Sequence, residues 1–316
     1  MNIAIIGAGI SGLSSAFGLC KKGYSITIFA EHFSPDTTSN KAAAFWFHYH
    51  IRNDKRGILW CRETYTFYKD LCSNEATGIS MHRLVKMMDD INNADNTWMD
   101  FMPAGSYRSL AKDELLPPYL MGYEMTVPLI ETQLFMPWLM QQLSEQNVKF
   151  KQQKITAFTE LYEYDYIINC AGLGAKELCN DDLVYPARGQ VALIAPQKHL
   201  PIFIDNGPPL YLVPRKDATI LGGTMELNEW DATTNPVTLK QIHQKLSTLF
   251  PSIKDEEILG SWAGLRPCRS EVRLERENNI IHNYGHGGSG YTLAWGCAKR
   301  VAEMVQLKNI AVIQSV

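Results

Sequence analysis

The sequence of 316 residues lacks the patterns that mark several large classes of protein. Its seven cysteines are scattered, odd in number and never paired as Cys-x-x-Cys, so neither a metal site nor a disulfide framework is expected. No apolar run approaches the roughly 20 residues that cross a bilayer. The first residues carry no basic segment before their apolar stretch, which argues against a signal peptide. A formal net charge of −3 provides no basic footprint for nucleic acid.

Internal repeats, low-complexity segments and composition shifts that would mark a linear domain boundary are also missing from the sequence. The length suits one large domain or two modest ones with a sizeable core. Hydrophobic content of 46% and charged content of 20% are ordinary for a soluble globular protein. These features predict a cytoplasmic enzyme whose thiols are mostly buried and reduced, with neither nucleic acid nor membrane as a partner.

Glycine, by contrast, is concentrated near both ends, and the N-terminal cluster has the context of a dinucleotide-binding turn. The run "NIAII" predicts a strand buried on both faces. Gly7, Gly9 and Gly12 follow it, and a helical pattern then ends near Gly23. These glycines would provide a tight turn, close approach of a pyrophosphate to the helix N-terminus, and close helix–strand packing. The next strand pattern ends at Glu31, whose carboxylate favours FAD or NAD over NADP.

The remaining pattern alternates between strands and helices. Helices are expected over 56–72, 130–147, 238–250 and 291–305, strands over 82–90, 123–130, 148–158 and 164–175, and short antiparallel strands over 189–196, 210–216 and 218–225. The elements typical of dinucleotide binding lie at both ends of the chain and near residues 148–175. Two domains interleaved in sequence are therefore predicted.

Taken together, the motifs resemble the D-amino-acid oxidase family of FAD-dependent oxidoreductases. "TTSNKAAAFW" is similar to the family's flavin-contacting loop, "INCAGLGA" to its central strand, and "ARGQ" to its entry into the substrate sheet. "GLRPCRSEVRLERE" and "IHNYGHGGSGYTLAWG" are the most specific matches. The resemblance implies an α/β fold in which a Rossmann-like FAD-binding domain (1–47, 145–183, 268–316) is interleaved with an α+β substrate-binding domain (48–144, 184–267) on a mixed or antiparallel sheet.

The resemblance also implies non-covalent FAD, with its pyrophosphate at the N-terminal turn and its isoalloxazine ring beside the C-terminal glycine turn. Backbone N–H groups and a helix dipole there would stabilise negative charge on the reduced flavin, and glycines would leave room for the ring. The implied cofactor-binding residues are Gly7, Gly9, Ile10, Ser11, Gly12, Glu31, His32, Thr37, Thr38, Ser39, Ala43, Ala44, Phe45, Ile155, Cys170, Ala171, Gly172, Gly287, Gly288, Ser289, Gly290, Tyr291 and Thr292.

Three residues match the family's substrate-binding groups. Arg273 matches the arginine that holds the substrate carboxylate, a role that suits a planar bidentate donor. Strand alternation would point Arg273 into a cavity while Val272 and Leu274 pack in the core. Tyr211 matches a tyrosine whose hydroxyl binds the same carboxylate, and Gly288 matches the glycine whose carbonyl accepts a hydrogen bond from the substrate amine.

Competing interpretations of these residues stay open at the level of sequence. Arg273 would otherwise belong to an ion-paired sheet surface with Glu271 and Glu275, and Tyr211 to an aromatic core. Other arginines rival Arg273 on spacing alone, and the motif match favours Arg273 over them; the rivals are Arg266, Arg269 and Arg276.

An apolar substrate pocket is predicted beside this group. Phe45, Phe47 and Tyr49 would alternate onto one side of an extended segment, and Val213 would share a strand face with Tyr211. No second cation for an acidic side chain is identifiable in the sequence. Structural hydrogen bonding, rather than general-base catalysis, is the preferred role for three nearby histidines, namely His48, His50 and His286. The segment before Tyr211 is shorter than in family members that carry an active-site lid.

The predicted reaction is oxidation of a neutral D-amino acid by FAD and O2, giving a 2-oxo acid, ammonia and hydrogen peroxide. Catalysis would be mainly positional, with the α-hydrogen held at the flavin. The alternatives are a glycine or sarcosine oxidase, a quinone-linked amino acid dehydrogenase, and a non-catalytic flavin-binding protein. A homodimer is the candidate assembly.

Overall fold

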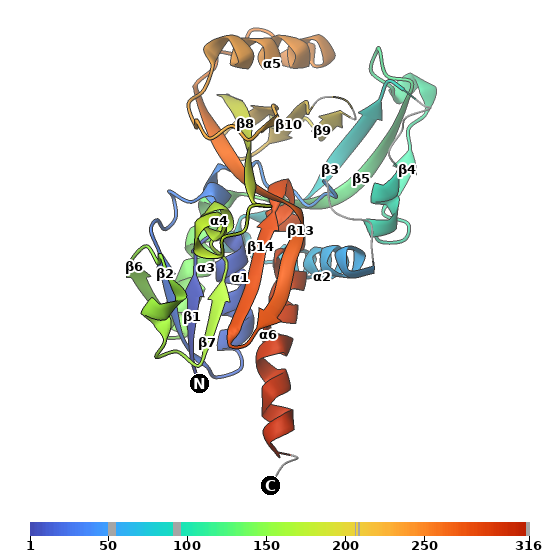
Figure 1. The fold of residues 1–316 in the computed structure, drawn as a ribbon. Helices are drawn as coiled ribbons and strands as arrows, with labels where there is room; N and C mark the ends of the chain where they lie inside the picture. Colours follow the sequence, from blue (N-terminus) through green and yellow to red (C-terminus); the bar gives the residue numbers. More distant parts are fainter. Residues whose placement is uncertain (50–54, 91–95, 206, 208, 314–316) are drawn as a thin grey trace.

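The fold is built around one large mixed sheet whose two ends form different halves (Figure 1). A computed structural model describes residues 1–49, 55–90, 96–205, 207 and 209–313, with side chains up to residue 306. The strand order is β4-β5-β3-β9-β10-β11-β8-β13-β14-β7-β1-β2-β6, and β12 pairs with β8 outside this path.

The nucleotide half is a parallel sheet with helices against one face. Its strands are β1 (Asn2–Ile6), β2 (Ser25–Ala30), β6 (Lys149–Gln152), β7 (Tyr166–Asn169) and β14 (Ile280–His286), and its helices are α1 (Ile10–Cys20), α3 (Thr132–Glu145) and α6 (Gly290–Ile313). Ile3 and Ile5 pack with the helices, while Ala4 and Ile6 face a second cluster around Leu161. Burial on both faces explains the continuous apolar run of β1.

The substrate half is mostly antiparallel, as the short strand patterns predict. It contains β3 (Ile79–Met88), β4 (Tyr107–Ser109), β5 (Met121–Ile130), β8 (Tyr185–Ile194), β9 (Ile202–Asp205), β10 (Tyr211–Pro214), β11 (Thr219–Gly222) and β12 (Glu226–Leu227). Only the pairing of β3 with β9 is parallel among its described strands. Helix α5 (Pro236–Leu249) covers one face through Leu239, Ile242 and Leu246, and Figure 1 shows it at one end of the molecule. The opposite face looks toward the nucleotide half.

One strand joins the two halves. β13 (Gly260–Glu277) pairs with β8 along Gly260–Cys268 and with β14 from Cys268 to Glu277, with an irregular register between Cys268 and Arg273. The sequence predicted a strand only around "EVRLERE", because the preceding residues lack clear alternation. The longer strand holds both halves in one hydrogen-bonded sheet.

Two further helices complete the framework. α2 (Lys55–Leu71) packs against α6, and the short α4 (Ala175–Leu178) follows β7. The predicted fold class is confirmed, whereas the boundaries of the interleaved domains stay a prediction. α3 packs against α1, so we would move the boundary at residue 145 to include this helix in the nucleotide half. No helix in the described part of the chain is long and apolar enough to cross a membrane.

Close packing of α6 depends on glycine. A Cβ on Gly296 would lie 2.3 Å from the Trp60 Cα and 2.4 Å from its carbonyl oxygen in α2, so the two backbones are in contact. A Cβ on Gly18 of α1 would meet the Ala298 carbonyl oxygen at an ordinary 3.6 Å.

Gly296→Ala should therefore lower the free energy of unfolding by about 1–3 kcal/mol or more, because the helices must separate. Gly18→Ala is the matched control and should raise it by about 0.5–1 kcal/mol through helix propensity. Urea unfolding followed by circular dichroism measures both. Equal effects of the two substitutions would contradict the packing account.

Candidate active site

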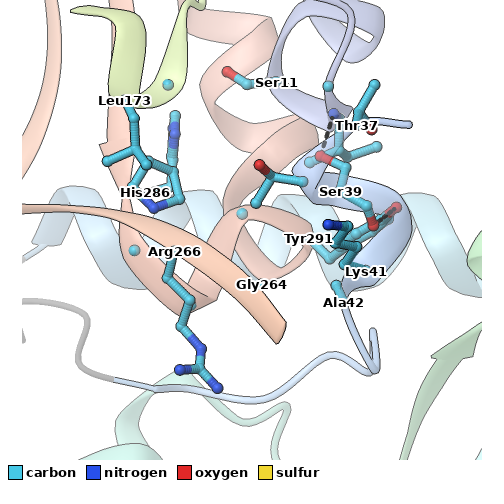
Figure 2. Close-up of a pocket in the computed structure, with 18 of the residues that line it drawn as sticks. Ser11, Thr37, Ser39, Lys41, Ala42, Leu173, Gly264, Arg266, His286 and Tyr291 are labelled. Atoms are coloured by element: carbon cyan, nitrogen blue, oxygen red, sulfur yellow. Dashed lines mark hydrogen bonds between the residues drawn. The ribbon is translucent and has the colours of Figure 1, made fainter. Parts of the chain in front are cut away.

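A cavity of about 1190 Å³ extends from the nucleotide half to the substrate half. Its walls include the turn after β1, the end of β2, the segment 36–49, the turn after β7 and the turn after β14. Figure 2 shows Ser11, Thr37 and Ser39 on one side of this space and His286 with Leu173 on the other, while Arg266 extends from β13. The cavity is large for a small-molecule site and has room for an extended dinucleotide together with a small substrate.

The N-terminal turn is shaped by glycines whose positions exclude side chains. Gly7 has φ of +102°, and a Cβ there would lie 2.3 Å from the Cys170 carbonyl oxygen. A Cβ on Gly12 would lie 1.9 Å from the Gly7 carbonyl oxygen, so this glycine allows α1 to pack against the turn. The N-cap of α1, Gly9, has no side chain to occupy the helix end, which leaves room for an anion near its N–H groups.

Most of the predicted cofactor-binding residues do line this cavity. Gly12 and Ser289 do not: both are buried just behind the wall. The Ser289 hydroxyl donates to the Tyr49 carbonyl oxygen at 2.5 Å, so it fixes the segment that carries the pocket residues. Glu31 directly follows β2 and lines the cavity, and its carboxylate lies 3.7 Å from Lys154 Nζ and 3.9 Å from His32 Nε2.

Tyr211 lies at the substrate end, with its ring over two glycines. It begins β10 and pairs directly with Gly222 on β11. A Cβ on Gly222 would lie 2.1 Å from Tyr211 Cζ, and one on Gly223 would lie 2.8 Å from Tyr211 Cε1. Any larger residue at 222 would displace the ring, so the neighbouring strand fixes the direction of the hydroxyl.

Arg266 of β13 also packs over a glycine of a neighbouring strand. A Cβ on Gly189 of β8 would lie 2.3 Å from Arg266 Nη2, so the guanidinium packs directly over this glycine. Arg266 Nη1 donates to the Thr224 carbonyl oxygen at 3.1 Å. Burial raises the pKa of Tyr49, while the charge of Arg266 opposes this rise and Tyr211 adds to it. Arg266 and Tyr211 therefore lie near enough to Tyr49 for their charges to act on its hydroxyl.

Arg273 does not line the cavity, so the prediction that its side chain points into the substrate cavity is wrong. Its Nε donates to Glu275 Oε1 at 2.6 Å, its Nη2 pairs with Glu277, and its Nη1 donates to the Tyr284 hydroxyl at 2.9 Å. This is the ion-paired sheet surface that competed with the active-site interpretation. The change of register between Cys268 and Arg273 separates Arg273 from the cavity-facing part of β13.

The pocket segment 45–49 follows the prediction only in part. Phe45, Phe47 and Tyr49 line the cavity as expected, but His48 lines it too, so the segment does not alternate as a strand. The His48 ring lies 4.1 Å from that of Phe101, centroid to centroid. His50 lies outside the described residues. Val213 is fully buried in the core and is not a wall of the cavity.

His286 presents a neutral ring to the cavity. Its Nε2 is buried and has no hydrogen-bond partner among the described residues. Burial lowers the pKa of His286 to about 4, because the imidazolium would lose its hydration. A hydrogen-bonded structural role is therefore not seen for Nε2, and this atom stays available to a group bound in the cavity.

Several residues at the substrate end were not predicted from the sequence to belong to the site. Lys86 of β3 is only 5% exposed and lines the cavity, so the expectation that no second cation would be found is wrong. Trp98 lines it as well. A lysine within the apolar run "RLVKMM" was a detectable signal, since few buried strands carry one. Among the described residues, no cluster of His, Cys, Asp and Glu could hold a metal ion.

Comparison with known proteins shows which family has this architecture. Residues 2–304 match the profile of the FAD dependent oxidoreductase family. A D-amino-acid oxidase of Rubrobacter xylanophilus is 32% identical over 309 residues, covering 95% of this chain and 94% of that protein. A D-amino-acid oxidase of Dictyostelium discoideum is 34% identical, with 96% and 91% covered. The glycine oxidase structure from Geobacillus kaustophilus shares the fold alone, with a TM-score of 0.83 at 17% identity over 96% of this chain and 94% of that one.

The neutral state of His286 should make folding sensitive to acid. The unfolded chain binds a proton at this residue near pH 6.5, whereas the folded chain binds it only near pH 4. Stability from this group is complete above pH 6.5 and falls as the pH drops toward 4, by on the order of 3 kcal/mol. Urea unfolding between pH 4 and 7 should show a smaller slope for His286→Gln. His199→Gln, at an exposed histidine, should keep the parent slope; identical curves for parent and His286→Gln would refute the assignment.

Proposed function

The chain belongs to the FAD-dependent oxidoreductase family, and from this membership we propose that it oxidises D-amino acids to 2-oxo acids, with ammonia and hydrogen peroxide as the other products. The relatives named D-amino-acid oxidase support the substrate class, since they match over nearly the whole chain. The observation that carries the proposal is the presence of both Arg266 and Tyr211 in the lining of a dinucleotide-sized cavity. Flavin binding alone would require neither.

The cavity fits FAD on independent grounds. Gly7, Gly9 and Gly12 leave a cradle that a Cβ would fill, and α1 presents its N-terminus to it. Glu31 stands at the end of β2, where a carboxylate can accept ribose hydroxyls. The buried Nε2 of His286 and the glycine turn before α6 would adjoin the ring system. When bound, FAD supplies a two-electron acceptor that O2 can reoxidise.

Arg266 would bind the substrate carboxylate. The guanidinium is held flat over Gly189 and by the Thr224 carbonyl, so it offers its fork without further ordering. The Tyr211 hydroxyl would donate to the same carboxylate. Tyr49 lies near enough to Arg266 and Tyr211 for their charges to act on it, and burial raises its pKa further above neutral pH, so its hydroxyl stays protonated.

The substrate amine and the α-hydrogen would be positioned from the opposite side. The Gly288 carbonyl would accept a hydrogen bond from the amine, and Tyr49 closes over this glycine so tightly that a Cβ on Gly288 would lie 2.8 Å from its ring. Phe45 and Phe47 exclude water from this region. No side-chain base is needed once the amine is neutral, which agrees with a His286 that titrates far below neutral pH. Catalysis then depends on orientation.

Glu31→Ala should weaken FAD binding by about 1–3 kcal/mol, because two charge-assisted hydrogen bonds to ribose would be lost. Titration of the apoprotein with FAD, followed by flavin fluorescence, measures the change. Glu163→Ala, at an exposed glutamate, is the charge-matched control and should leave the affinity unchanged. The parent should release intact FAD on acid denaturation; flavin that stays with the denatured chain would refute non-covalent binding.

Arg266→Ala should reduce kcat/KM for D-amino acids by about 10²-fold or more, while FAD stays bound. Arg266→Lys should recover part of the loss, since an ammonium lacks the bidentate geometry. Benzoate should perturb the flavin spectrum of the parent but not of Arg266→Ala. Arg273→Ala is the matched control and should retain activity and the benzoate response. If Arg273→Ala loses activity and the benzoate response while Arg266→Ala keeps them, Arg273 binds the substrate carboxylate and Arg266 does not.

A further inference from the structure

We propose that Lys86 makes this enzyme selective for D-amino acids that carry a side-chain carboxylate, D-aspartate and D-glutamate. The inference rests on the oxidation of D-amino acids proposed above and concerns the part of the same site that receives the side chain. It follows from where Lys86 lies relative to Tyr211 in the sheet, and from the fact that Lys86 and Arg266 line the same cavity.

The sheet register places Lys86 in one row with Tyr211. Lys86 of β3 pairs directly with Ile204 of β9, and Ile204 pairs directly with Tyr211 of β10. Directly paired residues project to the same face, and all three line the cavity. Two interstrand spacings, about 10 Å, separate the backbones of Lys86 and Tyr211. The Tyr211 hydroxyl itself lies over Gly222 of β11, so a substrate held there would meet Lys86 with a side chain that runs back along this row toward β3.

Burial makes Lys86 effective as an anion-binding group. The side chain is 5% exposed, whereas Lys41 at the flavin-loop end of the same cavity is exposed. The ammonium loses its hydration when the chain folds, so the free energy of that desolvation does not oppose the later binding of an anion. Water screens the attraction little at such a site.

Trp98 provides a second, independent indication of an acceptor at this end. Its indole Nε1–H is buried and has no hydrogen-bond partner among the described residues. The Trp98 ring lies 5.1 Å from that of Tyr123, which is the residue paired with Lys86 on β5, and 5.9 Å from that of Phe47. A buried donor without a partner is costly, and a ligand oxygen would satisfy it.

Asp205 is the acidic residue nearest to Lys86 in the sheet register, and its carboxylate is held by other groups. Asp205 also borders the cavity, but it follows Ile204 in β9, so its side chain projects toward the other face of the strand. Its Oδ1 accepts a hydrogen bond from the Gly207 N–H at 3.0 Å, and its carboxylate is hydrogen-bonded to Tyr119. Arg266 and Lys86 both line the cavity, so each carboxylate of a dicarboxylate substrate would have a cation to bind. Phe45 and Phe47 of the same lining would contact the methylene groups.

The test compares substrates that differ only in charge. For the FAD-loaded parent, kcat/KM for D-glutamate should exceed that for D-glutamine by about tenfold or more, and D-aspartate should exceed D-asparagine in the same way. Lys86→Met should lower kcat/KM for the acids by at least about 30-fold, the lower end for losing one partner of a buried charge pair, and leave D-glutamine within a few-fold. Lys86→Arg should keep the preference for acids.

Lys112→Met, an exposed lysine of the same half, controls for the change in net charge and should keep the parent ratios. Flavin absorbance and circular dichroism establish that each variant is folded. If Lys86→Met does not fold, the parent ratios and Lys86→Arg decide the question. If kcat/KM of the parent for the amides equals that for the acids, the role of Lys86 is overturned and the proposed function is not. Failure of every D-amino acid to bleach the flavin anaerobically would overturn the proposed function itself.

Discussion

The continuity of β13 is the constraint on which both halves of the structure depend. Its N-terminal part completes the antiparallel sheet through β8, and its C-terminal part completes the parallel sheet through β14. Arg266 stands on the first part, the second part pairs with β14, and the glycine turn of Gly287 and Gly288 follows β14. The cation proposed to bind the substrate and the turn proposed to face the flavin are therefore held at a fixed separation by backbone hydrogen bonds, and no flexible linker between them has to be ordered.

Glycines, which have no side chain, position the side chains of the candidate site. Gly189 accommodates the guanidinium of Arg266, Gly222 the ring of Tyr211, and Gly288 the ring of Tyr49. In each case the glycine lies on a different element from the residue that it accommodates, so strand pairing fixes the side chain from outside its own strand. Such support resembles a well-packed second layer around a binding site, built here from close backbone contact rather than from hydrogen bonds.

The sequence was sufficient for the nucleotide half and insufficient for the substrate end. "NIAII", the spaced glycines and Glu31 encode a local βαβ unit whose neighbours in sequence are also neighbours in space. Arg266 and Arg273 differ in role because β13 shifts register between Cys268 and Arg273, and a sequence pattern of alternation does not reveal that shift. Lys86 was missed because its importance depends on β9 and β10, which lie more than 100 residues later in the chain.

The interleaved strand order has a consequence for biosynthesis. β1 lies between β2 and β7, and β7 pairs with β14, so the parallel sheet gains its strands at residues near 30, 150, 169 and 286. While the chain emerges from the ribosome, the edge of β7 has no partner until nearly all of the chain has been made. The nascent protein exposes that edge throughout this time, which is the situation in which chaperones protect folding chains from aggregation.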